Sequence, residues 1–147
     1  MRVVVQRVKK ASVSVDKNIV GSISRGLLIF FASHPHDDNS QITWLAEKIK
    51  NLRVFTDANN KMNLSLEDVN GEILIISQFT LYADCNKGRR PSFINAASSD
   101  IAKDFYDKFV SFIEKNFLGR VQTGIFQADM QVYSINDGPV TLIIDAK

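Results

Sequence analysis

The chain has 147 residues, of which 45% are hydrophobic, and a formal net charge of +2. A chain of this length buries roughly 70% of its unfolded surface as one domain, so we expect a single domain over residues 1–147. The small net charge argues neither for nor against nucleic-acid binding, which would need a local basic patch. The single cysteine, Cys85, excludes an intrachain disulfide and fits a reducing compartment.

The sequence contains no apolar run of the length needed to cross a membrane. Residues 1–8 are typical of a β-strand rather than of a signal peptide. We therefore expect a cytoplasmic protein without membrane contacts.

The first third of the chain predicts a small antiparallel sheet. Residues 1–8 are rich in β-branched side chains, and residues 12–15 alternate with period two. Residues 16–18 indicate a turn and residues 19–23 a returning strand. Residues 26–32 form a continuous apolar run, which favours a strand buried on both faces.

The middle of the chain predicts a helix and a long central strand. Residues 38–40 offer N-caps for a helix that runs to about residue 52. Its apolar residues recur at spacings of three and four, namely Ile42, Leu45, Ala46, Ile49 and Leu52. Residues 57–63 are turn-like, and residues 72–82 predict the central strand.

The last third predicts a second helix and two closing strands. The helix begins near Ser99 and carries an apolar stripe of Ile101, Ala102, Phe105, Phe109, Phe112 and Ile113. Residues 124–135 and 140–145 are typical of strands. The whole pattern favours an α+β fold with a mainly antiparallel, barrel-like sheet and two principal helices.

The first motif, residues 77–84 (SQFTLYAD), lies at the end of the predicted central strand. Ser77 or Thr80 would need a neighbouring base to act as a nucleophile. The only histidines are His34 and His36, so a Ser-His-Asp arrangement is one interpretation. The alternative is that Ser77 and Thr80 make hydrogen bonds at a strand end, with Gln78 free to orient a polar substrate group.

Residues 34–38 (HPHDD) combine imidazole and carboxylate groups, which suit divalent metals. No second cluster of such residues accompanies them, so we expect no metal. The pattern favours a polar loop leading to a helix N-terminus, where the two aspartates interact well with the helix dipole. A metal-dependent hydrolase that uses His34 and His36 remains an alternative.

The second motif, residues 136–141 (NDGPVT), joins the two closing strands. Its Asp-Gly pair is a strong hairpin-turn signal. Its Gly138-Pro139 pair also favours a rigid segment of carbonyl oxygens, because proline fixes its own φ and glycine allows close approach. Both interpretations remain open from the pattern alone.

Lys87, Arg89 and Arg90 lie in a basic loop directly after the first motif. Such a loop could bind phosphate beside a nucleotide site, or could simply be solvated. A non-enzymatic RNA-binding module that uses this loop is therefore a further alternative.

The two motifs resemble the signature segments of the D-aminoacyl-tRNA deacylases. The resemblance extends along nearly the whole chain, through residues 1–13, 61–64, 88–93, 122–126 and 128–132. Gln127 departs from it, since the family more often has a small residue there.

The resemblance implies a homodimeric hydrolase that acts on the aminoacylated 3′ end of tRNA without a cofactor. It implies that Ser77, Gln78, Phe79 and Thr80 form the pocket wall, with Phe126 near the terminal adenine and Ala102 close by. It also implies that Gly138 and Pro139 form a cis element that reaches into the pocket of the partner subunit.

Such an element would leave room for hydrogen but not for a methyl group, and would therefore exclude L-amino acids. Glycine would be accepted, including glycine mischarged on alanine tRNA. The resemblance further implies catalysis assisted by the ribose 2′-OH of the tRNA, with Thr80 in a supporting role.

Overall fold

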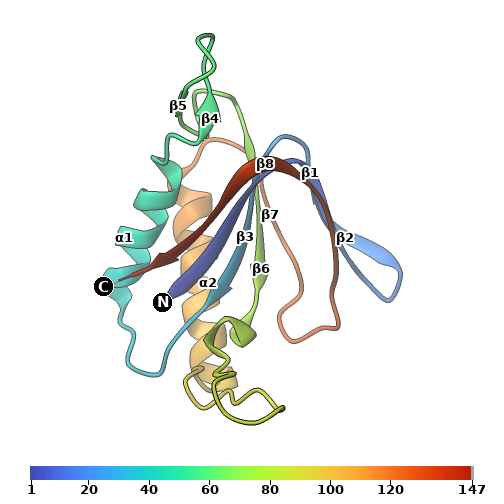
Figure 1. The fold of residues 1–147 in the computed structure, drawn as a ribbon, viewed down its shortest axis with the longest axis vertical. Coiled ribbons are helices and arrows are strands. Elements are labelled where there is room, and N and C mark those ends of the chain that lie inside the picture. Colours follow the sequence, from blue (N-terminus) through green and yellow to red (C-terminus); the bar gives the residue numbers. More distant parts are fainter. Residues whose placement is uncertain (147) are drawn as a thin grey trace.

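The computed structural model describes residues 1–146, and Figure 1 shows a curved sheet with helices against one face. The helical elements are α1 (Asn39–Lys50), the short 3-10 helix η1 (Phe79–Tyr82) and α2 (Ser99–Asn116). The strands are β1 (Arg2–Val15), β2 (Asn18–Ile23), β3 (Gly26–Ala32), β4 (Phe55–Thr56), β5 (Met62–Leu64), β6 (Glu72–Ser77), β7 (Val121–Thr123) and β8 (Gln131–Asp145). Within residues 1–146, no helix is long and apolar enough to cross a membrane.

The long strand β1 organises the sheet. One side of β1 pairs with β3 over Arg2 to Val8 and then with β2 from Ala11 onward, and its other side pairs with β8. These three pairings are antiparallel, whereas β3–β6 and β6–β7 are parallel. The predicted α+β fold is therefore confirmed, with a parallel region added at β6.

The sheet curls until β2 approaches β7. A Cβ atom at Gly21 would lie only 2.6 Å from the carbonyl oxygen of Thr123, so glycine permits this close approach. The curled inner face buries a cluster that includes Val13, Leu28 and Leu74. The sheet is therefore barrel-like, as predicted.

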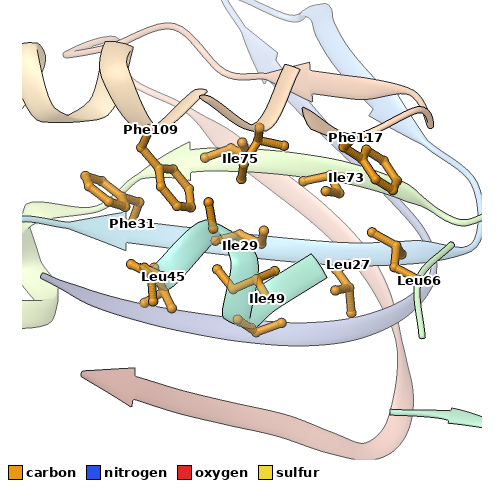
Figure 2. Packing of buried hydrophobic residues seen from close by; sticks show 14 of the residues in the cluster. Leu27, Ile29, Phe31, Leu45, Ile49, Leu66, Ile73, Ile75, Phe109 and Phe117 are labelled. Atoms are coloured by element: carbon orange, nitrogen blue, oxygen red, sulfur yellow. The ribbon is translucent and has the colours of Figure 1, made fainter. Parts of the chain in front are cut away.

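The larger hydrophobic core lies between the sheet and the two helices. Figure 2 shows side chains of β3 and β6 facing those of α1 and α2. Phe31 and Phe109 stack with ring centroids 4.7 Å apart, and both are almost completely buried. These contacts hold the carboxyl ends of β3 and β6, where the first motif begins.

Helix α1 begins as the sequence predicts. Asp38 is the N-cap, and its carboxylate accepts a hydrogen bond of 2.8 Å from the Ser40 amide. The Gln41 side chain accepts in turn from the Asp38 amide at 3.0 Å, which completes a capping box. The Ser40 hydrogen bonds hold the pKa of Asp38 below its usual value.

Helix α2 begins at Ser99 as predicted and buries Phe105, Phe109 and Ile113. The predicted stripe is wrong at Ile101, which is 42% exposed, and it omits Tyr106. The Tyr106 hydroxyl donates to the Ile75 carbonyl at 2.9 Å. The spacing of apolar residues could not reveal Tyr106, because its buried hydroxyl is polar and is satisfied by a hydrogen bond to a strand carbonyl.

The predicted central strand over residues 72–82 is too long. β6 ends at Ser77, because its parallel neighbour β3 ends at Ala32 and offers no further ladder partner. The last hydrogen bond between the two segments runs from the Gln78 amide to the Phe31 carbonyl at 2.7 Å. The chain then turns into η1, so the first motif lies mainly on a 3-10 turn.

The predicted hairpin at the second motif is also wrong. The segments on both sides of the motif pair with the same strand, β1, within one continuous strand β8. Thr141 pairs with Gln6 and Asn136 with Val8, so four residues of β8 bulge opposite Arg7. Proline has no N–H to donate, and a bulge on an edge strand tolerates it.

The first predicted closing strand begins too early. β7 ends at Thr123, and β8 begins only at Gln131. Between them Gln127 has a φ of 63°, which is incompatible with a continuous strand. Residues 124–130 therefore form a loop, and this loop lies beside the first motif.

Candidate functional site

A pocket of about 740 Å³ opens at the carboxyl end of β6. This volume lies within the usual range for small-molecule and cofactor sites. Its walls come from the first motif, residues 93–102 and the loop before β8. The lining residues are Ile76, Ser77, Gln78, Phe79, Phe93, Ala96, Ala97, Ser98, Ser99, Ala102, Phe126, Gln127, Ala128, Met130 and Val132.

The first motif forms one wall through the strand end and the turn after it. Ser77 pairs with Phe31 in the parallel ladder, so its position is set by the core. The Gln78 side chain donates to the Thr80 hydroxyl at 2.5 Å, which fixes the side-chain amide beside the pocket. Thr80 does not line the pocket and contacts it through Gln78.

Phe126, Ala102 and Phe93 also line the pocket. The ring of Phe126 lies 5.8 Å from that of Tyr106, and burial raises the pKa of the Tyr106 phenol. Phe93 meets Phe79 edge-on with ring centroids 5.2 Å apart. Aromatic side chains in a pocket lining favour a flat ring, such as a nucleobase, as part of the ligand.

The lining of the pocket contains no Asp, Glu, His, Cys, Lys or Arg. It therefore holds no side chain that could act as a general base at neutral pH. The polar groups available to a ligand are serine hydroxyls, glutamine side-chain amides and backbone groups. The amides of Phe79 and Thr80 open η1, and within residues 1–146 neither donates to a carbonyl.

The second motif is held by a buried arginine that the sequence did not single out. Arg7 is 6% exposed and donates to the Asp137 carbonyl at 3.1 Å and the Gly138 carbonyl at 3.2 Å. It also forms an ion pair with the Asp137 carboxylate at 3.0 Å and donates to the Val54 carbonyl. The Gly138-Pro139 peptide bond is cis.

The one sequence signal for this role is the position of Arg7 within a strand rich in valine. A charged side chain buried there needs a polar partner, but the sequence does not identify that partner. The partner comes from 130 residues further along the chain.

The two motifs lie at opposite ends of the sheet. The second motif bulges opposite Arg7, whose ladder neighbours are Leu27 and then Ile73. Ser77 lies four residues further along β6, about 13 Å along the strand direction at the usual strand rise, and β1 and β3 separate β8 from β6. Within one chain, Gly138 and Pro139 therefore do not reach the pocket that Ser77, Gln78, Phe79, Ala102 and Phe126 line.

His34 and His36 lie outside this pocket. Their ring centroids are 5.3 Å apart, but the neighbouring Asp37 already binds the N-terminal ammonium at 2.6 Å and the His34 amide at 2.6 Å. Among residues 1–146, no three His, Cys, Asp or Glu side chains gather in a metal-binding arrangement. The aspartates of this loop cap helix α1 and anchor Met1 instead.

Comparison with known proteins gives one consistent result. Residues 4–145 match the family described as D-Tyr-tRNA(Tyr) deacylase. Proteins named D-aminoacyl-tRNA deacylase from Desulfotalea psychrophila and Thermosipho africanus are 54% and 56% identical over 147 residues, covering 100% of this chain and 98% of each relative.

A solved structure titled c-Myc DNA Unwinding Element Binding Protein has a TM-score of 0.94 and 37% identity, with 100% of this chain and 99% of that chain covered. The match to the family covers both motifs and the whole pocket wall. The chain belongs to the D-Tyr-tRNA(Tyr) deacylase family.

Proposed function

We propose that this protein is a D-aminoacyl-tRNA deacylase, which hydrolyses the ester between a D-amino acid and the 3′ end of tRNA. The observation that carries this proposal is the uncharged pocket bounded by Ser77, Gln78 and Phe79, in a chain that belongs to this family. A pocket of about 740 Å³ with aromatic walls fits an aminoacyl group and the adenosine that carries it. In this assignment the adenine lies near Phe126.

Catalysis in this pocket relies on position and on backbone groups. An aminoacyl ester is already activated, so precise placement and stabilisation of the oxyanion lower its barrier substantially. The free amides of Phe79 and Thr80 are the candidate oxyanion donors. The attacking step uses the adjacent ribose 2′-OH of the tRNA, and Thr80 supports Gln78.

Selection against L-amino acids comes from Gly138 and Pro139 of a second subunit. Because the second motif lies at the other end of the sheet from its own pocket, a homodimer is needed to bring the two together. β8 is an edge strand, and it exposes Tyr133, Ile135 and Ile143. A long apolar edge of this kind is a natural pairing surface.

In the dimer, the carbonyl oxygens of the second motif lie against the α-carbon of the bound amino acid. They leave room for hydrogen but not for a side chain, so every L-amino acid meets the same clash. Glycine has no side chain and is hydrolysed too, including glycine mischarged on alanine tRNA. Arg7 fixes these carbonyls by binding Asp137 and Gly138.

The test is deacylation of D-tyrosyl-, L-tyrosyl- and glycyl-tRNA by the same protein preparation, measured with and without EDTA. We expect hydrolysis of the D-tyrosyl and glycyl esters and none of the L-tyrosyl ester above the background rate. Equal resistance of all three esters would contradict the enzymatic function and leave a binding module. Activity lost in EDTA would instead support a metal-dependent hydrolase.

A further inference from the structure

A loop of concentrated positive charge extends from the pocket wall. Residues 85–93 contain Lys87, Arg89 and Arg90 and no acidic residue, and all of them are exposed. No carboxylate within residues 1–146 forms an ion pair with these three cations. Lys103 and Lys108 on helix α2 differ, since each is paired with an aspartate one turn away.

This basic loop is built as a closed turn rather than as a loose connection. Asp84 and Ser92 exchange backbone hydrogen bonds of 2.8 and 2.9 Å at its base. The Asp84 carboxylate accepts from the backbone and side chain of Asn86, so it is occupied on the inner side. Gly88, with a φ of 72°, turns the chain at the tip.

The base of the loop is part of the pocket. Phe93 follows Ser92 directly, lines the pocket and contacts Phe79. Arg90 lies three residues before Phe93, which is at most about 11 Å of extended chain. Arg90 therefore lies close to the pocket lining in the chain, while the pocket itself offers no charge to an anionic substrate.

We propose that the basic loop binds the backbone phosphates of the tRNA acceptor end. This inference rests on the proposed function, which places the terminal adenosine in the pocket. The nucleotides that precede this adenosine must then leave through the mouth, and their phosphates pass within reach of Arg89 and Arg90. Exposed, unpaired guanidinium groups are the preferred partners of such phosphates.

The experiment compares two substrates in the Arg89→Gln/Arg90→Gln protein. D-tyrosyl-tRNA carries the phosphates, whereas D-tyrosyl-adenosine enters the pocket without them. Two lost phosphate contacts lower kcat/KM for the tRNA on the order of 25- to 60-fold at 0.1 M salt, and reduce its logarithmic salt slope by about 1.4 to 1.8. kcat/KM for D-tyrosyl-adenosine stays at the wild-type value.

The matched control is Lys48→Gln/Lys61→Gln, which removes the same charge from exposed positions on α1 and the β4–β5 turn. The control keeps wild-type kinetics on both substrates. Equal losses on both substrates in the arginine variant would overturn the inference, because the loop would then shape the pocket. An effect no larger than the control's would overturn it as well. Wild-type inactivity on both substrates would overturn the proposed function itself.

Discussion

The two motifs of this chain are built in opposite ways. The first motif lines a pocket of its own chain, whose side chains are all neutral. The second motif lies away from that pocket, yet it is fixed by an ion pair between Arg7 and Asp137 and by Arg7 hydrogen bonds to the carbonyls of Asp137 and Gly138. In the proposed function, the pocket holds the substrate and the second motif of another subunit selects it.

This difference teaches where the function resides. A segment held so firmly on an exposed edge strand has no evident purpose in a single copy of the chain. In the proposed dimer, a second copy of the chain would present this segment to the pocket.

Arg7→Met should be the most damaging single change. It leaves the carbonyls of Asp137 and Gly138 and the Asp137 carboxylate without their donor, at an expected cost of about 3–5 kcal/mol in unfolding free energy. Arg2→Met on the same strand is the control, because the Arg2–Asp145 pair is exposed and worth less than about 1 kcal/mol. Urea unfolding measures both. Similar losses in the two variants would contradict the role assigned to Arg7.

Gly138→Ala should separate activity from stability. The added Cβ would meet only the Asn136 side chain, at 3.8 Å, so the unfolding free energy should change by less than about 0.5 kcal/mol. In the partner's pocket the same methyl group would occupy space beside the substrate, and D-tyrosyl-tRNA deacylation should fall by at least about 100-fold.

The control is Gly21→Ala, whose Cβ would lie 2.6 Å from a backbone oxygen and should destabilise the fold. Gly138→Ala with full activity would mean that the second motif does not enter a pocket.

Thr80→Val should have a smaller effect. It removes the hydroxyl that accepts from Gln78 but keeps the shape of the side chain. Deacylation should fall by no more than about tenfold, because the residue positions Gln78 and does not attack the ester. Complete loss of activity in a folded Thr80→Val protein would identify Thr80 as the nucleophile.

Asp145→Asn should give the smallest effect, which is present at neutral pH and lost at low pH. The hydrogen bond from Arg2 lowers the pKa of Asp145 in the folded state. The carboxylate therefore contributes stability above its unfolded pKa of about 3.9, and this contribution is lost as the pH falls through the lower folded value. The stability difference between wild type and variant should stay below about 1 kcal/mol at pH 7 and disappear as the pH falls below the lowered pKa of the folded state. A difference that grows on acidification would contradict this assignment.

The sequence predicted those parts of the fold that depend on local signals. β1, β3 and the N-cap at Asp38 follow from β-branched runs, an apolar run and a capping residue. The end of β6 did not follow from any local signal, because it depends on where β3 ends. The second motif misled for the same reason: a turn signal was overridden by pairing with β1 on both sides.

The site divides in the same way. Ser77, Gln78 and Phe79 could be named because they are contiguous and resemble a family motif. Phe93, Ser99 and Arg7 could not, since their roles depend on contacts far apart in sequence. The register between strands that are far apart in sequence is set only in the folded sheet, so no repeating pattern in the sequence predicts it.

Mixing two inactive variants tests most directly whether the two motifs complete one site across two chains. Ala102→Trp fills the pocket but keeps the second motif, and Gly138→Ala alters the second motif but keeps the pocket. After joint refolding, dimers that contain one copy of each should restore about a quarter of wild-type D-tyrosyl-tRNA deacylase activity, from one intact site in half of the dimers. A mixture as inactive as its two components would contradict the account.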